Sequence, residues 1–125
     1  MAMQEITTND APPSIGPFSR AVESDGTVYV SGQGPINPDT EEIVKRDPRV
    51  QTRRTLDNIA AILDAADRSL DDIVKATIFV SDMAHYDAIN EVYGEMLSEP
   101  YPARSAVEVV RMPVDILVEI EVMAE

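Results

Sequence analysis

The sequence predicts an α+β domain in which two helices pack on the same face of one β-sheet. Apolar residues recur at helical spacing after Pro48 and again after Asp82, and the runs between and around them alternate or are β-branched, as in strands. The expected order is hairpin, helix, strand, helix, strand, strand. Right-handed crossovers then place both helices on one side of the sheet. With 125 residues, of which 44% are hydrophobic, residues 1–125 are expected to form a single domain.

The first half of the chain contains the predicted hairpin and the first helix. Residues 16–32 read GPFSRAVESDGTVYVSG, in which two β-type runs flank the turn signal SDG. A short third strand is expected at residues 42–44. Asp47 and Pro48 are an N-cap followed by a proline at the first helical position, which predicts a helix from Pro48 to about Ala66.

The second half begins with IVKATIFV, residues 73–80, which is typical of a buried strand. Asp82 is expected to cap a second helix, which ends before Pro100. The apolar stripe of that helix is Ile89, Val92, Tyr93, Met96 and Leu97. Two strands, 105–111 and 116–124, complete the sheet.

The last strand predicts two different faces, because strand side chains alternate. Its apolar positions, expected under the helices, are Ile116, Val118, Ile120, Val122 and Ala124. Its other face, which no helix covers, carries Leu117, Glu119, Glu121 and Met123. Large apolar groups on a bare face cost about 25 cal/mol per Å² left in water, so we expect a closed homo-oligomer that encloses them. A solvated outer face is the alternative.

Composition excludes several classes of function. Ten Lys and Arg stand against 23 Asp and Glu, and a net charge of −13 argues against nucleic-acid binding. The absence of cysteine removes disulfides, thiol nucleophiles and Cys-ligated metals. The single histidine, His85, cannot alone form a transition-metal site and is expected at the surface, so we expect no metal and no cofactor.

The sequence also predicts a cytoplasmic location. No apolar run approaches the roughly 20 residues that a membrane helix needs. The N-terminal stretch MAMQEITTNDAPP lacks a basic region followed by an apolar one, so we expect no signal peptide.

Arg104 is the most informative single residue, because it is a scarce cation at the start of a strand that enters the core. A partly buried guanidinium without an anion is costly. Either Glu119 or Glu121 neutralises it within the chain, or it binds the carboxylate of a ligand through two parallel hydrogen bonds. The residues alone leave both possibilities open.

The chain resembles the RidA (YjgF) family of reactive-intermediate deaminases. The resemblance extends over nearly the whole chain, through the motifs APPSIGPFSRAV, SGQGPINPDT, QTRRTLDNIAAIL, DIVKATIFVSDM, INEVYGEM, PARSAVEV and VEIEVMA. It implies a chorismate-mutase-like fold, a homotrimer with active sites between subunits, and hydrolysis of 2-imino acids to 2-keto acids and ammonia without a cofactor.

The resemblance also implies roles for individual residues. Arg104 clamps the substrate carboxylate and Glu119 holds and activates the attacking water. Ser31 and Gly32 line the pocket, and Asn90 lies near it. Held in register, an electrophilic imine and a water need only general-base help, typically worth 10²–10⁴-fold in rate.

Two positions depart from the family pattern. Phe18 stands where the family commonly has tyrosine, which removes a hydroxyl from the pocket, and Ala106 stands where relatives often have cysteine or threonine. The change at Phe18 keeps open an alternative, in which the same cleft binds a keto acid as a non-catalytic regulatory trimer. A ribonuclease activity, the third alternative, fits poorly with the acidic charge and the single histidine.

Overall fold

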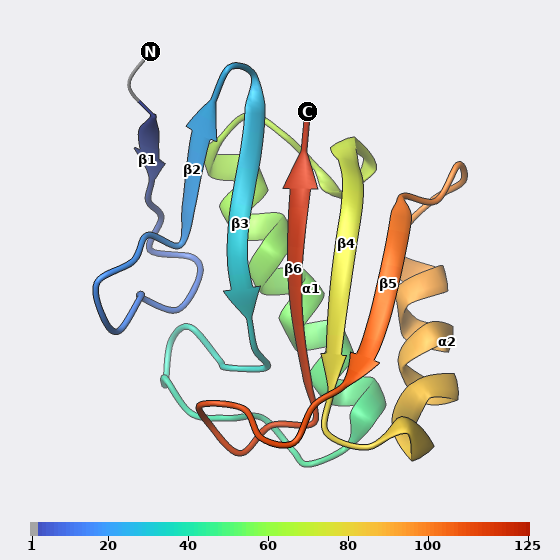
Figure 1. The fold of residues 1–125 in the computed structure, drawn as a ribbon. Helices are drawn as coiled ribbons and strands as arrows, with labels where there is room; N and C mark the ends of the chain where they lie inside the picture. Colours follow the sequence, from blue (N-terminus) through green and yellow to red (C-terminus); the bar gives the residue numbers. More distant parts are fainter. Residues whose placement is uncertain (1–2) are drawn as a thin grey trace.

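The computed structural model describes residues 3–125 and has one six-stranded sheet with two helices on one of its faces (Figure 1). The strand order is β1-β2-β3-β6-β4-β5. The strands are β1 (Gln4–Ile6), β2 (Ala21–Ser24), β3 (Thr27–Gln33), β4 (Ile73–Val80), β5 (Ala103–Glu108) and β6 (Val118–Ala124). The helices are α1 (Pro48–Ala65) and α2 (Tyr86–Met96). The predicted α+β class and its single-faced helical layer are confirmed.

The connections between the strands explain why both helices lie on one face of the sheet. β4 and β5 pair in parallel through α2, whereas every other strand pair is antiparallel. α1 links β3 to β4, and β6 lies between these two strands. Both helices therefore lie behind the sheet in Figure 1, and they pack against each other. No helix in residues 3–125 is long and apolar enough to cross a membrane.

Helix starts follow the predicted capping chemistry. The Asp47 carboxylate accepts hydrogen bonds from the backbone N–H groups of Arg49 and Val50, at 2.9 and 3.1 Å. The Val50 N–H contributes most to lowering the pKa of Asp47. Asp82, however, caps a short 3-10 turn (Met83–His85) rather than α2 itself, so the second helix begins at Tyr86, three residues later than its cap suggested.

The core lies between the helices and the inner face of the sheet. All five inward positions predicted for the last strand are buried. Leu117 is also buried, at 3% exposure, and the prediction that it lies on the bare face was wrong. The reason is that β6 begins at Val118, so strand alternation does not extend back to Leu117, whose N–H is held by the Gln51 side chain at 2.8 Å.

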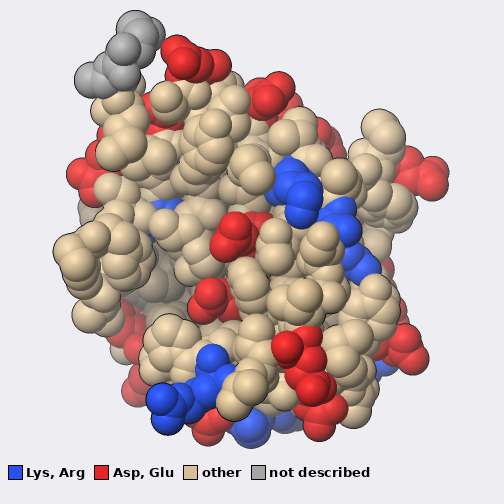
Figure 2. All heavy atoms as spheres, in the orientation of Figure 1, with Lys and Arg blue, Asp and Glu red and all other residues tan. Residues whose placement is uncertain are grey.

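The outer face of the sheet is bare, as predicted (Figure 2). Tyr29 pairs with Met123 across β3 and β6, and the two side chains are 44% and 36% exposed. Val107 on β5 is 44% exposed beside Phe79. Figure 2 shows carboxylates in the middle of this face, with basic side chains to one side of them and uncharged side chains over most of the rest. A mostly uncharged face of this kind is typical of surfaces that another chain covers.

Three further strands differ from the sequence-based expectation. β1 was not predicted, because its three residues are too few to show a period. The strand expected at residues 42–44 is a single bridge between Ile36 and Ile43. The strand expected at 105–111 runs from Ala103 to Glu108, so Arg104 lies inside it rather than before it.

Ile59→Ala is expected to lower the free energy of unfolding by about 2–5 kcal/mol, because Ile59 is fully buried in the core. Asp57→Ala, at an exposed position of the same helix, is the matched control and should change it by less than about 0.5 kcal/mol. Chemical denaturation measures both. Equal losses would contradict the assignment of the core.

Candidate active site

A β-bulge lies where two of the predicted site residues occur. Val30 pairs with Val122 and Gln33 pairs with Ile120, so β3 has one residue more than β6 over this stretch. Ser31 and Gly32 together therefore stand opposite a single residue of β6. Bulges of this kind bend a strand and re-aim side chains, often beside active sites.

Gly32 is required by the close approach of Glu119. A Cβ added at Gly32 would lie 2.8 Å from Cδ and 3.1 Å from Cγ of Glu119. No Cβ fits there unless the glutamate moves. The missing side chain at Gly32 thus leaves the space in which the Glu119 carboxylate lies against the backbone of the bulge.

Glu119 is half-buried on the uncovered face and makes no hydrogen bond or ion pair within the described part of the chain. Burial raises the pKa of its carboxyl, and the negative charge of Glu121, two residues along the same face, raises it further. A carboxylate with a raised pKa and free lone pairs is a stronger base than an ordinary one, so it is suited to accept and return a proton.

Ser31 and Phe18 flank this carboxylate. The Ser31 hydroxyl donates to the Ser19 carbonyl at 2.6 Å, and the Ser31 N–H donates to the Arg20 carbonyl at 2.8 Å, so neither donor is free for a ligand. The Ser31 oxygen keeps only its acceptor capacity. Phe18 follows a tight turn at Gly16, whose φ of 129° favours glycine, and its ring is 53% exposed.

Phe18, Gly32 and Glu119 line one hollow of about 150 Å³. Arg20 and Ile116 also contribute to its walls. The structure therefore brings together three of the predicted site residues at the end of β3, and Ser31 lines a neighbouring hollow with Phe18 and Glu121.

The remaining predicted residues form a second group, at the edge strand β5. Arg104 donates from Nη2 to the Tyr86 hydroxyl at 2.9 Å, and its Cζ lies 4.8 Å from the Tyr93 ring centroid and 5.7 Å from that of Tyr86. Asn90 lies on the same helix, with its Oδ1 buried and without a hydrogen-bond partner. Ala106, two residues beyond Arg104, packs against the core.

Arg104 has no carboxylate partner among residues 3–125. Of the two possibilities that the residues left open, neutralisation by Glu119 or Glu121 within the chain is therefore excluded. Arg104 pairs with the buried Ala76 and faces α2, whereas Glu119 pairs with Phe79 and faces away from the helices. β4 also separates their strands, so the two groups of site residues cannot meet within one chain.

Tyr86 was missed by the sequence analysis, which also treated Tyr93 as a core residue. Tyr93 is indeed buried, and its burial raises the pKa of its phenol, although the charge of Arg104 acts in the opposite direction. Tyr86, Asn90 and Tyr93 are spaced i, i+4, i+7, which places them on one face of a helix. This polar and aromatic stripe on α2, the helix that precedes the strand carrying Arg104, is the signal that could have identified Tyr86.

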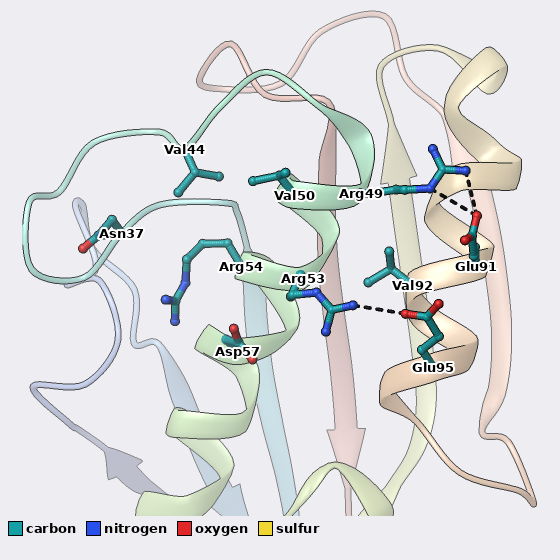
Figure 3. Close-up of a pocket in the computed structure, with 10 residues that line it drawn as sticks. All are labelled: Asn37, Val44, Arg49, Val50, Arg53, Arg54, Asp57, Glu91, Val92 and Glu95. Atoms are coloured by element: carbon teal, nitrogen blue, oxygen red, sulfur yellow. Dashed lines mark hydrogen bonds and ion pairs between the residues drawn. The ribbon is translucent and has the colours of Figure 1, made fainter.

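A larger hollow, of about 450 Å³, lies on the helix side and contains none of the predicted site residues (Figure 3). Figure 3 shows ion pairs between α1 and α2 at one side of it, Arg49 with Glu91 at 2.7 Å and Arg53 with Glu95 at 3.1 Å. All four side chains are more than half exposed, so these pairs contribute little to stability.

No group of three or more acidic or histidine side chains in the described structure could hold a metal ion.

The family model described as Endoribonuclease L-PSP matches residues 8–125. A RutC family protein of Pyrococcus horikoshii is 50% identical over 119 residues, covering 95% of this chain and 94% of that protein. A 2-iminobutanoate/2-iminopropanoate deaminase of Escherichia coli is 43% identical over 122 residues, covering 95% of this chain and 94% of that protein. A solved structure of the conserved Rid protein family from Yersinia pestis is 45% identical, covers 98% of both chains and superimposes with a TM-score of 0.95.

Gly32→Ala is expected to displace the Glu119 carboxylate while the fold is retained, because the side chain of Glu119, unlike backbone, can move out of the way. Stability measured in a double-mutant cycle with Glu119→Ala tests the contact. The cost of Gly32→Ala should be smaller when Glu119 is already truncated. Equal costs in both backgrounds would contradict the close approach.

Glu119→Gln is expected to stabilise the protein at pH 7. A raised pKa means that the folded state binds the proton more tightly than the unfolded chain, so the free energy of unfolding falls as pH rises above the ordinary value of 4.5. The glutamine variant lacks this loss, and its advantage should disappear as the pH is lowered below that value. Denaturation across pH measures the difference, and a variant that is less stable at pH 7 would contradict the raised pKa.

Proposed function

The chain belongs to the RidA (YjgF) family, and on this premise we propose that it is a hydrolytic deaminase of 2-imino acids. Its substrates are 2-iminobutanoate and 2-iminopropanoate, and its products are the 2-keto acid and ammonia. The observation that carries the proposal is the guanidinium of Arg104, which is half-buried, has no carboxylate partner among residues 3–125 and is held by the Tyr86 hydroxyl and the Tyr93 ring. The 43% identity to a deaminase of that name supports the choice of substrate.

Arg104 binds the substrate carboxylate in this proposal. The net charge of −13 does not prevent this, because charges beyond about 10 Å are largely screened at 0.1 M salt. An ion pair at about 4 Å in a partly desolvated site is worth roughly 4 kcal/mol, against roughly 1 in bulk water. The local attraction therefore exceeds the repulsion from distant acids.

Glu119 acts as the general base. It removes a proton from a water while the water oxygen attacks the imine carbon, and the C=N π electrons move to nitrogen, which takes that proton from Glu119. Glu119 then removes the hydroxyl proton of the tetrahedral intermediate as the C=O bond forms and the C–N bond breaks, and it passes this proton to the nitrogen, which leaves as ammonia. The raised pKa of Glu119 suits a group that must both take and give this proton.

The other site residues shape the pocket. Gly32 leaves room for the carboxylate and its water, and the exposed Phe18 ring provides an apolar surface for the side chain of the imino acid. Ser31 fixes the bulge through its hydrogen bonds rather than donating to the ligand. Asn90 and the backbone near Ala106 border the position of the substrate carboxylate.

A homotrimer, with each site between two subunits, completes the proposal. Arg104 and Glu119 lie on opposite faces of the sheet, so one catalytic site needs Arg104 from one chain and Glu119 from another. The bare outer face, with Tyr29, Val107 and Met123, is the surface that association would bury.

A non-catalytic trimer that binds keto acids is the second candidate. Phe18 favours it, because it leaves the hollow beside Glu119 without the hydroxyl common in the family. Calorimetry with 2-oxobutanoate and an imine assay separate the two functions, since binding without hydrolysis identifies the regulatory protein.

The nuclease activity in the description of the family model is not favoured by this chain. Its charge of −13 and the carboxylates Glu119 and Glu121 on the open face would repel a phosphate backbone.

Arg104→Ala is expected to reduce imine hydrolysis to the rate in buffer, because the substrate carboxylate loses its counter-charge. The assay follows the loss of imine absorbance after a dehydratase has generated 2-iminobutanoate. Arg46→Ala, which removes an exposed arginine that pairs with Asp115, is the matched control and should retain activity. An active Arg104→Ala variant would exclude the assigned role.

Mixing Arg104→Ala with Glu119→Gln is expected to restore activity that neither variant has alone. If each site combines the two residues from different chains, co-refolding equal amounts gives about a quarter of the wild-type activity, because each chain supplies its intact residue half of the time. Sedimentation analysis checks that mixed oligomers form. Mixed oligomers without activity would contradict a shared site.

A further inference from the structure

The hydrogen bond between Arg104 and Tyr86 has a fixed direction. A guanidinium has only donors, so in the 2.9 Å contact the Tyr86 oxygen must be the acceptor. The hydrogen of the Tyr86 hydroxyl is therefore not used in this contact and points elsewhere.

No acceptor takes this hydrogen in the part of the chain that the structure describes. The side-chain oxygen of Asn90, one helical turn away, is buried without any hydrogen-bond partner, so it does not accept the Tyr86 proton. Tyr86 itself is only half-buried. A free phenolic O–H thus lies next to a guanidinium that has no anion.

We propose that Tyr86 is a second ligand of the substrate carboxylate, donating its O–H to one carboxylate oxygen while Arg104 donates to the other. This assignment rests on the proposed function of the Arg104 site. A planar carboxylate suits the pair, since it offers two oxygens to two neighbouring donors and one negative charge to one positive charge.

The environment of Tyr86 strengthens it as a donor. A hydrogen bond donated by the amide of Asn90, whose oxygen is the atom without a partner, has the largest effect in lowering the pKa of the Tyr86 phenol, and the charge of Arg104 lowers it further. A more acidic hydroxyl, already polarised by accepting from a cation, donates a stronger hydrogen bond. Because Tyr86 and Tyr93 are neutral, they also hold Arg104 in place without reducing the charge that attracts the substrate.

This arrangement predicts selectivity. A ligand whose carboxylate is esterified loses both the charge for Arg104 and the strong acceptor for Tyr86. The site should therefore distinguish 2-imino and 2-keto acids from neutral imines and ketones of the same shape, independently of what Glu119 does at the imine carbon.

Tyr86→Phe tests the proposal, because it keeps the ring beside Arg104 and removes only the hydroxyl. Calorimetry should show 2-oxobutanoate binding about ten-fold more weakly to the variant, whereas the methyl ester of 2-oxobutanoate should bind both proteins alike. Tyr101→Phe is the matched control, since its hydroxyl donates to the Gly94 carbonyl at 3.2 Å, and it should bind the acid as the wild type does.

The imine assay provides the second readout. Tyr86→Phe should raise KM for 2-iminobutanoate with kcat unchanged, because the carboxylate it contacts does not change during the reaction. Equal binding of 2-oxobutanoate to the variant and the wild type, with the wild type active, would overturn the role of Tyr86 and leave the deaminase intact. A ten-fold loss of 2-oxobutanoate affinity with an inactive wild type would leave Tyr86 as a carboxylate ligand and overturn the deaminase instead.

Discussion

No acid within residues 3–125 balances the charge of Arg104, and this constraint shapes the rest of the site. The guanidinium is held by the hydroxyl of Tyr86 and the ring of Tyr93, so it is fixed in position without being neutralised. A half-buried cation in this state is costly when unliganded and favourable when an anion arrives. This cost of an unpaired cation occurs at the edge strand β5, where a ligand can approach from outside the sheet.

The sheet divides the chemistry into two halves. Strand alternation directs Arg104 toward α2 and Glu119 toward the open face, and β4 separates them. The Glu119 half has its own local design, in which a bulge and a glycine make room for a carboxylate whose proton is held more tightly than usual. In the proposed deaminase each half is incomplete, which would give the bare sheet face a functional reason to associate as well as a hydrophobic one.

Much of the fold could be predicted from the sequence because its signals are local. The Asp47 cap, the 73–80 strand and the alternation from Val118 onward each depend on residues close in the chain. Leu117 was placed on the wrong face because alternation was extended one residue beyond the strand. The sequence did not show which face of the sheet carries Arg104, because polar and apolar residues occur on both faces of the strand PARSAVEV. Only the pairing of this strand with β4 and its packing on α2 decide the face.

The site residues were identified by resemblance. The residues alone could not show that Arg104 and Glu119 lie apart within one chain, because this depends on the order and pairing of the strands, which is a tertiary property.

A crystal structure of the protein with 2-oxobutanoate tests the central claim most directly. The account predicts the carboxylate on Arg104 of one subunit, with the keto carbon facing the Glu119 carboxylate of a neighbouring subunit. A keto acid bound elsewhere, or an Arg104 occupied by an acid of a neighbouring chain with no room for a ligand, would contradict it.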